Sequence, residues 1–212
     1  MNGSTPAFLA LAAGAASIGA LHSLAPDHWV PFAALARARG WSTWKTARIT
    51  AVCGLGHVTV SALLGLLALW FGLKTLRLFG ERLEAVAGIL LIAFGLAYGI
   101  WGLRNAMSEK LHHHSHVDPE KTSVLTLFLL FSADPCVAVM PLLFAAAPLG
   151  VFKAGAVVLT YELATLSAMI ALVMLANAGA QRLRAHWLDH YGDASAGGVI
   201  AVTGVAVLLL GW

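Results

Sequence analysis

The chain has 212 residues, of which 59% are hydrophobic and only 11% are charged, and its mean hydropathy is +0.82. Soluble domains carry roughly 25% charged residues, so this composition excludes an ordinary cytosolic enzyme and predicts an all-α polytopic membrane protein in the lipid bilayer. The formal net charge of +3 rests on few ionisable groups, which argues against a nucleic-acid partner and leaves the basic residues as a signal of membrane topology.

Six apolar segments follow one another along the chain, each near the ~20 residues that a helix needs to cross a bilayer. They cover residues 6–24, 49–73, 83–103, 123–147, 150–177 and 196–212. The fourth and fifth are separated only by the turn sequence Ala147-Pro148-Leu149-Gly150. With six crossings, the loops on one side hold nine Lys and Arg residues and those on the other side hold four. The richer side is expected to be cytoplasmic, so both termini should face outward from the cell (inner) membrane.

The two halves of the sequence resemble each other, which predicts two three-helix repeats. Residues 1–103 form the first repeat, residues 104–122 form a cytoplasmic loop, and residues 123–212 form the second repeat. Trp44-Lys45 corresponds to Phe152-Lys153, and a polar segment interrupted by proline stands early in each half. Because three is an odd number of spans, the second repeat should be inverted, as in transporters that bind their substrate near the midplane. The alternative is that hydrophobic helices resemble one another by chance.

The most unusual motif is His22-Ser-Leu-Ala-Pro-Asp-His28, at the end of the first span. Ionisable side chains beside lipid are costly and indicate a functional site. Pro26 lacks the N–H group that the His22 carbonyl would need in a helix, so we expect the helix to break between His22 and Asp27. The break would let His22, Asp27 and His28 surround one ion. Imidazole ligands favour a late first-row divalent metal, and the sequence leaves nickel, cobalt, zinc and iron open.

Further polar side chains within the spans are candidates for the same site. His57 lies deep in the second span and is a candidate ligand, with a buried structural histidine as the alternative. Asp134 and Cys136 flank Pro135 in the fourth span, and Glu162 lies in the fifth. These three residues are secondary candidates, because carboxylates in a membrane helix can equally be paired with hydroxyl groups or backbone donors of the bundle.

A histidine-rich tract follows the third span. It contains His112, His113, His114 and His116. Such tracts are typical of metal binding, and we expect this loop to collect or sense metal rather than to conduct it. An incidental polar linker is the alternative.

The two histidine motifs of the first half carry a family resemblance. His-x4-Asp-His at His22–His28, followed by Leu55-Gly-His-Val-Thr59, resembles the nickel/cobalt transporter (NiCoT) family and its UreH/HupE-type and RcnA-type relatives. The resemblance implies a divalent-metal permease in which His22, Asp27, His28 and His57 are required for the metal. Most NiCoT members have eight spans, so six spans resemble the shorter UreH-like and exporter branches, within a LysE-like superfamily architecture.

The second half carries a different resemblance. The segment Ala133-Asp-Pro-Cys-Val-Ala-Val-Met-Pro141 resembles the S-P-C-V-x-P element of CcdA/DsbD-type thiol electron transporters. A membrane thiol–disulfide carrier that uses Cys53 and Cys136 is therefore the alternative function, and a metal chaperone or sensor without transport is a third. The sequence contains no G-x-x-x-x-G-K-[ST] nucleotide-binding loop, so ion gradients, the membrane potential or a partner would drive transport. The direction of transport, the coupling ion and homo-oligomer formation stay open.

Overall fold

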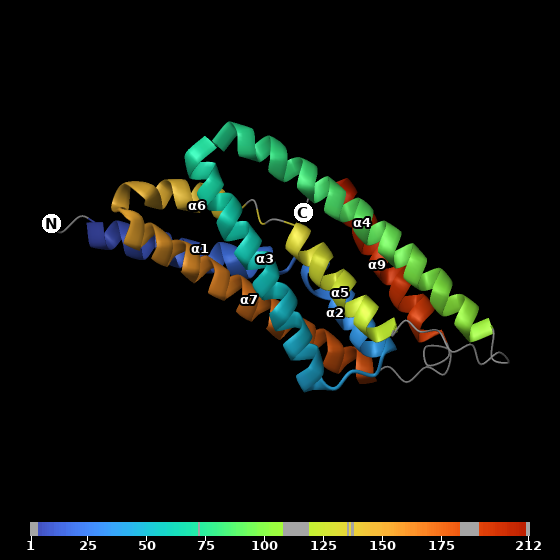
Figure 1. Ribbon diagram of the computed structural model, residues 1–212. Helices are drawn as coiled ribbons and strands as arrows, with labels where there is room; N and C mark the ends of the chain where they lie inside the picture. Colours follow the sequence, from blue (N-terminus) through green and yellow to red (C-terminus); the bar gives the residue numbers. More distant parts are fainter. Residues whose placement is uncertain are drawn as a thin grey trace.

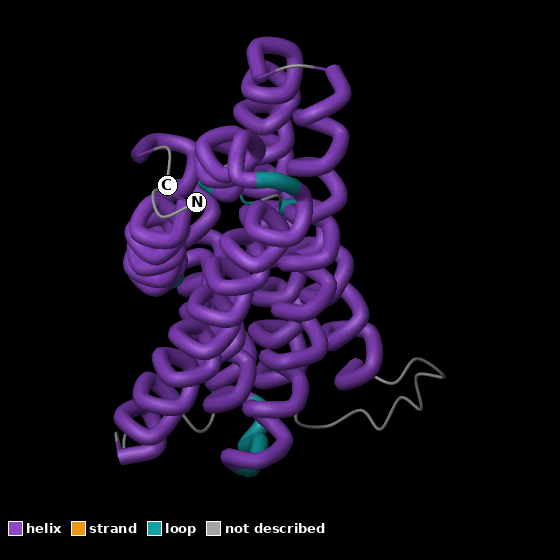
Figure 2. The backbone as a smooth tube through the Cα atoms, turned by 90° about the vertical axis from the view of Figure 1, so that its left-hand side faces the viewer, coloured by secondary structure: helices purple, strands orange, loops and turns teal. Residues whose placement is uncertain are grey.

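The computed structural model describes residues 4–71, 73–107, 119–134, 136, 138–182 and 191–210. Every regular element in these residues is helical, as Figure 1 and Figure 2 show. In chain order the elements are α1 (Ser4–His22), α2 (Pro26–Ala38), α3 (Thr43–Phe71), α4 (Leu73–Met107), α5 (Pro119–Ala133), α6 (Val139–Ala146), the 3-10 helix η1 (Ala147–Leu149), α7 (Val151–Arg182) and α9 (Gly192–Leu210).

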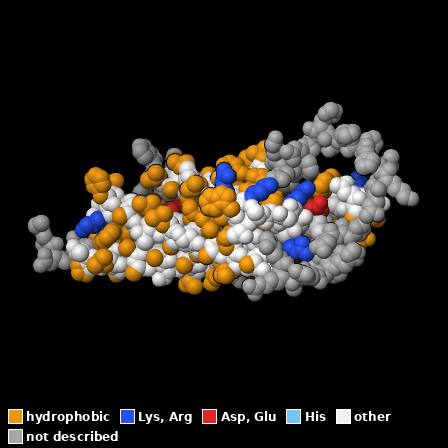
Figure 3. Space-filling view, turned by 90° about the horizontal axis from the view of Figure 1, so that it is seen from below, with side chains coloured by type: hydrophobic (Ala, Val, Ile, Leu, Met, Phe, Trp, Pro, Cys, Tyr) orange, Lys and Arg blue, Asp and Glu red, His pale blue; other side chains and the backbone are white. Residues whose placement is uncertain are grey.

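The outer surface of the described helices is largely apolar. The helices α1, α3, α4, α7 and α9 are each long and apolar enough to cross a membrane, and only 11–39% of their apolar stretches is buried inside the protein. Large side chains such as Leu9, Leu66 and Val202 therefore lie outside, and hydrophobic side chains cover much of the face in Figure 3. An apolar surface of this extent needs lipid around it, so the chain is a multi-pass helical membrane protein.

The predicted break at the end of the first span is confirmed. Helix α1 ends at His22 and α2 begins at Pro26. Because Pro26 has no N–H group, the His22 carbonyl accepts a hydrogen bond from the Ala25 N–H at 3.1 Å instead. Proline is favoured in the first turn of a helix, where N–H groups have no helical partner. Helix α2 therefore starts with Asp27 and His28 in its first turn.

The fourth expected span, residues 123–147, consists of two shorter helices. Helix α5 ends at Ala133 and α6 begins at Val139, so this segment is interrupted much as the first one is. The turn predicted at residues 147–150 is confirmed: η1 is followed by Gly150, whose φ of 94° is a conformation that favours glycine. The short α6 thus leads directly into α7.

Two pairs of neighbouring helices run in the same direction. Helix α1 lies beside α7 (Figure 1), and Gly19 near the end of α1 faces Tyr161 and Thr165. Helix α3 follows the interrupted pair α5 and α6, because Gly56 faces Ser132 of α5 and Gly65, further along, faces Leu143 of α6. Each interrupted helix therefore packs against a long helix from the other half of the chain.

Helices α4 and α9 pack against each other in opposite directions. Figure 1 shows α9 lying along the second half of α4. Gly95 faces Gly197 and Ala201, while Gly102 faces Asp193 at the beginning of α9. Small residues let the two backbones approach closely, as is common between membrane helices. This pair joins the last helix of each half.

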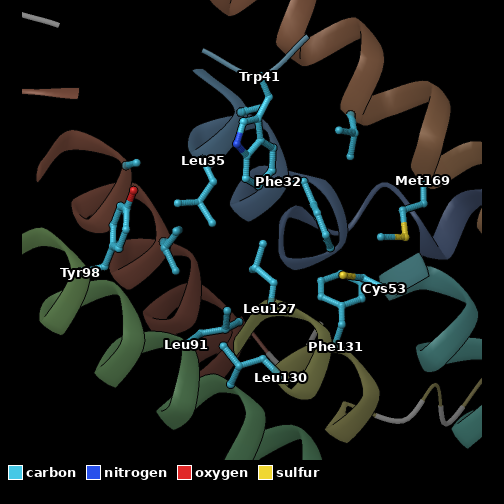
Figure 4. Close-up of a cluster of buried hydrophobic side chains, with 14 of the residues drawn as sticks. Phe32, Leu35, Trp41, Cys53, Leu91, Tyr98, Leu127, Leu130, Phe131 and Met169 are labelled. Atoms are coloured by element: carbon cyan, nitrogen blue, oxygen red, sulfur yellow. The ribbon is translucent and has the colours of Figure 1, made fainter. Parts of the chain in front are cut away.

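The interior contains two clusters of buried hydrophobic side chains. The larger one draws residues from α2, α3, α4, α5, α7 and α9 and includes Phe32, Leu127 and Phe131 (Figure 4). The smaller one joins α1, α6 and α7 and includes Cys136 and Tyr161. Buried polar side chains gather where these two clusters meet, and they form the candidate site.

Candidate metal centre

Three histidine side chains from three helices meet in the interior. His22 ends α1, His28 lies in the first turn of α2, and His57 lies in the middle of α3. The ring centroids of His22 and His28 are 4.4 Å apart, and those of His28 and His57 are 5.2 Å apart. On a continuous helix His22 and His28 would point about 120° apart. The break between α1 and α2 is therefore what allows the two rings to meet.

Asp27 fixes the orientation of the His28 ring. Its Oδ1 atom lies 2.9 Å from the Nδ1 atom of His28, and both side chains are buried. Since a carboxylate oxygen accepts hydrogen bonds, Nδ1 carries the hydrogen and the lone pair of the neutral ring is on Nε2. Carboxylates orient metal-ligating imidazoles in this way. The structure thus places Asp27 behind His28, whereas the sequence suggested Asp27 as a ligand.

His57 is oriented by a backbone carbonyl. Its Nδ1 atom lies 3.2 Å from the carbonyl oxygen of Phe131 in α5. In a continuous helix that oxygen would accept from residue 135, but Pro135 has no N–H group to donate. The proline therefore frees a carbonyl, and the His57 ring donates to it. This bond leaves the lone pair of His57 on Nε2 as well.

The Nε2 atoms of His22, His28 and His57 are all buried without a hydrogen-bond partner in the part of the chain that the structure describes. His28 and His57 are only 2% and 1% exposed. A buried polar atom without a partner costs about 1–3 kcal/mol, and such atoms in native proteins call for an explanation. Three neighbouring imidazoles with unpartnered ring nitrogens fit a bound late first-row divalent metal ion.

Cys136 joins this group from the segment between α5 and α6. Its Sγ atom and one ring nitrogen each of His22 and His57 all lie within 4.8 Å of one another. The backbone N–H of Cys136 donates to the Ser61 hydroxyl at 2.8 Å, and its sulfur is hydrogen-bonded to the hydroxyl of Tyr161. The two interrupted helices, one in each half of the sequence, therefore contribute side chains to the same site.

Two of the other predicted site residues lie near the histidines, and the remaining ones fall outside the described residues. Asp134 precedes Cys136 and interacts electrostatically with His28. Glu162 follows Tyr161 on α7, and both of its carboxylate oxygens are buried without a hydrogen-bond partner among the described residues. The histidines of the predicted capture loop all lie outside the described residues: His112, His113, His114 and His116.

The two cysteines have separate surroundings. Cys53 is fully buried in the larger hydrophobic cluster, where Figure 4 shows it close to Phe131 and Met169. Cys136 belongs to the smaller cluster, and both cysteines are free thiols. The hydrogen bond to Ser61 anchors Cys136 two helical turns beyond Cys53 along α3, a rise of about 12 Å. Cys136 therefore lies with the histidines, and Cys53 lies in the apolar core.

The sequence did not identify three groups that shape the site. These are the hydroxyl groups of Ser61 and Tyr161 and the carbonyl of Phe131. Ser61 lies one turn from His57 on the same face of α3, a spacing that could have revealed it. Tyr161 and Phe131 reach the site only through the packing of α5 and α7 against α3, which no local sequence pattern encodes.

Searches against family models, curated proteins and solved structures find no match to the chain.

Proposed function

We propose that the chain is a membrane transporter for a late first-row divalent metal of the nickel/cobalt type. The observation that carries this proposal is the group of buried imidazoles of His22, His28 and His57, whose Nε2 atoms have no partner among the described residues. Neutral imidazole binds such ions well, whereas magnesium and calcium prefer oxygen. The resemblance of residues 22–59 to nickel/cobalt transporters points to the same class of substrate.

The proposed architecture has six crossings arranged as two inverted three-helix repeats. In this arrangement α1, α3 and α4 are the first three crossings, α5 with α6 is the fourth, and α7 and α9 are the last two. The directions of the helices support it, because α1 runs parallel to α7, and α3 runs parallel to α5 and α6. In the two repeats α1 corresponds to α5 with α6, and α3 corresponds to α7. The pair of α1 with α7 therefore has its counterpart in the pair of α3 with α5 and α6. Each repeat then begins with an interrupted helix, as at transport sites near the midplane.

The same arrangement suggests which parts move. A transporter must open its site to the two sides of the membrane in turn. The segments between α1 and α2 and between α5 and α6 can change conformation without bending a long helix. The first connects His22 to His28, and the second holds Cys136. The closely packed α4 and α9 act as the rigid part against which they move. Metal would enter and leave as these two segments rearrange.

Metal flux into liposomes tests the proposal. Purified protein is reconstituted with a fluorescent chelator inside, and Ni2+ or Co2+ is added outside. The wild type is expected to carry the ion. His22→Ala or His57→Ala is expected to reduce the flux by at least ~10–100-fold, because changes at residues that only support a metal ligand already cost that much. Ser17→Ala on α1 and Thr59→Ala on α3 are the matched controls, because the two hydroxyls donate to Ala13 and Leu55 of their own helices.

Folding of each variant is checked by gel filtration and thermal unfolding in detergent. Wild-type flux in both folded histidine variants would contradict the proposal. A wild-type protein that binds Co2+ tightly but shows no flux in either membrane orientation would instead support the metal chaperone or sensor.

A further inference from the structure

We propose that Cys136 is a metal ligand and that the site accordingly takes a thiophilic ion with a tetrahedral preference, Co2+ or Zn2+ rather than Ni2+. This inference rests on the proposed function and concerns the same site. The sulfur of Cys136 and one ring nitrogen each of His22 and His57 form a group whose members all lie within 4.8 Å of one another. Cys136 is only 2% exposed, so its sulfur is buried inside the protein.

We assign the fourth donor to His28, which lies outside the group of Cys136, His22 and His57 and would have to move toward it on binding. Its ring lies against both other histidine rings, at 4.4 Å and 5.2 Å between centroids. Its Nε2 is buried without a partner among the described residues, and Asp27 holds the ring from behind. One thiolate and three imidazoles make a four-coordinate set, and sulfur with nitrogen donors in that number is typical of tetrahedral zinc and cobalt sites.

The hydrogen bonds around the sulfur suit a ligand. The sulfur of Cys136 is hydrogen-bonded to the hydroxyl of Tyr161 on α7. That hydroxyl would donate to the sulfur if the thiolate bound a metal. Ser61 holds the backbone N–H of Cys136 and in turn donates to the carbonyl of His57 at 2.9 Å. Partners of this kind orient ligands at metal sites. Cys136 and His57 are therefore fixed relative to each other through one serine.

Binding requires the site to contract. With metal–nitrogen bonds of ~2.0–2.1 Å and a metal–sulfur bond of ~2.3 Å, tetrahedral donors lie about 3.4–3.6 Å apart, which is less than the present 4.8 Å limit. In the binding step the S–H bond breaks, a metal–sulfur bond forms, and the proton passes to the buffer. No electron is transferred, so the thiol is not oxidised. The contraction draws the two interrupted helices toward α3.

Cobalt spectroscopy on the purified protein tests this inference. Co2+ bound by a thiolate gives a near-ultraviolet sulfur-to-cobalt charge-transfer band, and tetrahedral Co2+ gives intense visible bands. The wild type and Cys53→Ser are expected to show both, with Cys53→Ser as the matched control because that thiol lies in the apolar core. Cys136→Ser should still bind Co2+ through the histidines, without the charge-transfer band and at least about tenfold more weakly.

The outcomes separate the two proposals. If wild-type protein binds Co2+ in a His57-dependent manner but gives no charge-transfer band, Cys136 is not a ligand, and the imidazole site stands. Weak visible bands typical of octahedral Co2+, or tighter binding of Ni2+ than of Co2+ and Zn2+, would overturn the assignment of the ion. Absence of Co2+ binding altogether would overturn the proposed function. The spectra and the order of affinities are measured on the unmodified protein, and the His57 variant is checked for folding by gel filtration and thermal unfolding.

Discussion

Replacing Asp27 with asparagine separates the two roles that this carboxylate could have at the site. As a metal ligand it would contribute an oxygen to the ion. In the structure it lies on the far side of the His28 ring, 2.9 Å from Nδ1. Asparagine keeps an oxygen that accepts from Nδ1 and removes only the charge. We therefore expect Asp27→Asn to leave the donor set unchanged and to weaken binding through electrostatics alone.

The structure sets the scale of that loss. The distance from the carboxylate oxygen to an ion on Nε2 is the length of the hydrogen bond, the width of the imidazole ring and a metal–nitrogen bond of ~2.1 Å. Together these place the ion about 7 Å from the oxygen. At an effective dielectric constant of ~20, a divalent ion and a unit negative charge at this separation attract by about 5 kcal/mol. This figure is an upper limit, since changes behind a ligating histidine cost about 10–100-fold in affinity, or roughly 1.4–2.7 kcal/mol. We expect Asp27→Asn to fall in that range.

The measurements are Co2+ affinity by competition with a chelator and the coordination shell by X-ray absorption. Asp193→Asn is the matched control, because Asp193 accepts from the Tyr98 hydroxyl at 2.6 Å and pairs with Arg39 at 3.3 Å, at the opposite end of α2. That variant should bind Co2+ like the wild type. Affinity of Asp27→Asn within twofold of wild type would refute the orienting role, and loss of an oxygen from the coordination shell would show that Asp27 is a direct ligand.

Two further predictions concern pH and helix packing. Metal affinity should fall as pH is lowered and never rise, because protons compete for the lone pairs of imidazole and thiolate donors; a titration of Co2+ affinity between pH 8 and 5 checks the sign, and binding that strengthens in acid would contradict an imidazole site. Gly19→Ala should lower the thermal stability and Co2+ affinity, because its Cβ would lie 2.6 Å from the Tyr161 carbonyl oxygen, whereas Gly14→Ala, with open space around it, should lower neither. In the same way Gly197→Val should destabilise the α4–α9 pair by the ~1–3 kcal/mol typical of overpacking, while its neighbour Gly198→Val should not, and equal melting temperatures for the two would show that the backbones are not in contact.

Much of the framework could be predicted because it depends on local chemistry. Apolar length located the membrane helices, and the missing N–H group of Pro26 located the break before α2. The second interruption was anticipated from the proline in Asp134-Pro-Cys136, within the span expected over residues 123–147. The histidines could be named because ionisable groups in a membrane segment are rare and costly.

What could not be predicted depends on the packing of helices distant in sequence. The role of Asp27 depends on whether its side chain points at the ion or at His28, which the backbone of α2 decides. The partners of Cys136 lie 75 residues before it and 25 residues after it. The carbonyl of Phe131 becomes available to His57 only through the register of α5 against α3. Such registers result from the fit of many side chains along two helices rather than from one motif.

The hydrogen bond between His57 and Phe131 has a consequence for biosynthesis. A chain emerges from the ribosome with its N-terminus first, so α3 enters the membrane 74 residues before the carbonyl that orients its histidine exists. Throughout that interval the newly made first half has no fixed tautomer at His57 and lacks the thiol of Cys136. Ribosome-bound intermediates should therefore escape capture of cytosolic metal, and the ability to hold an ion should arise late, when α5 has been inserted and the following cysteine has arrived.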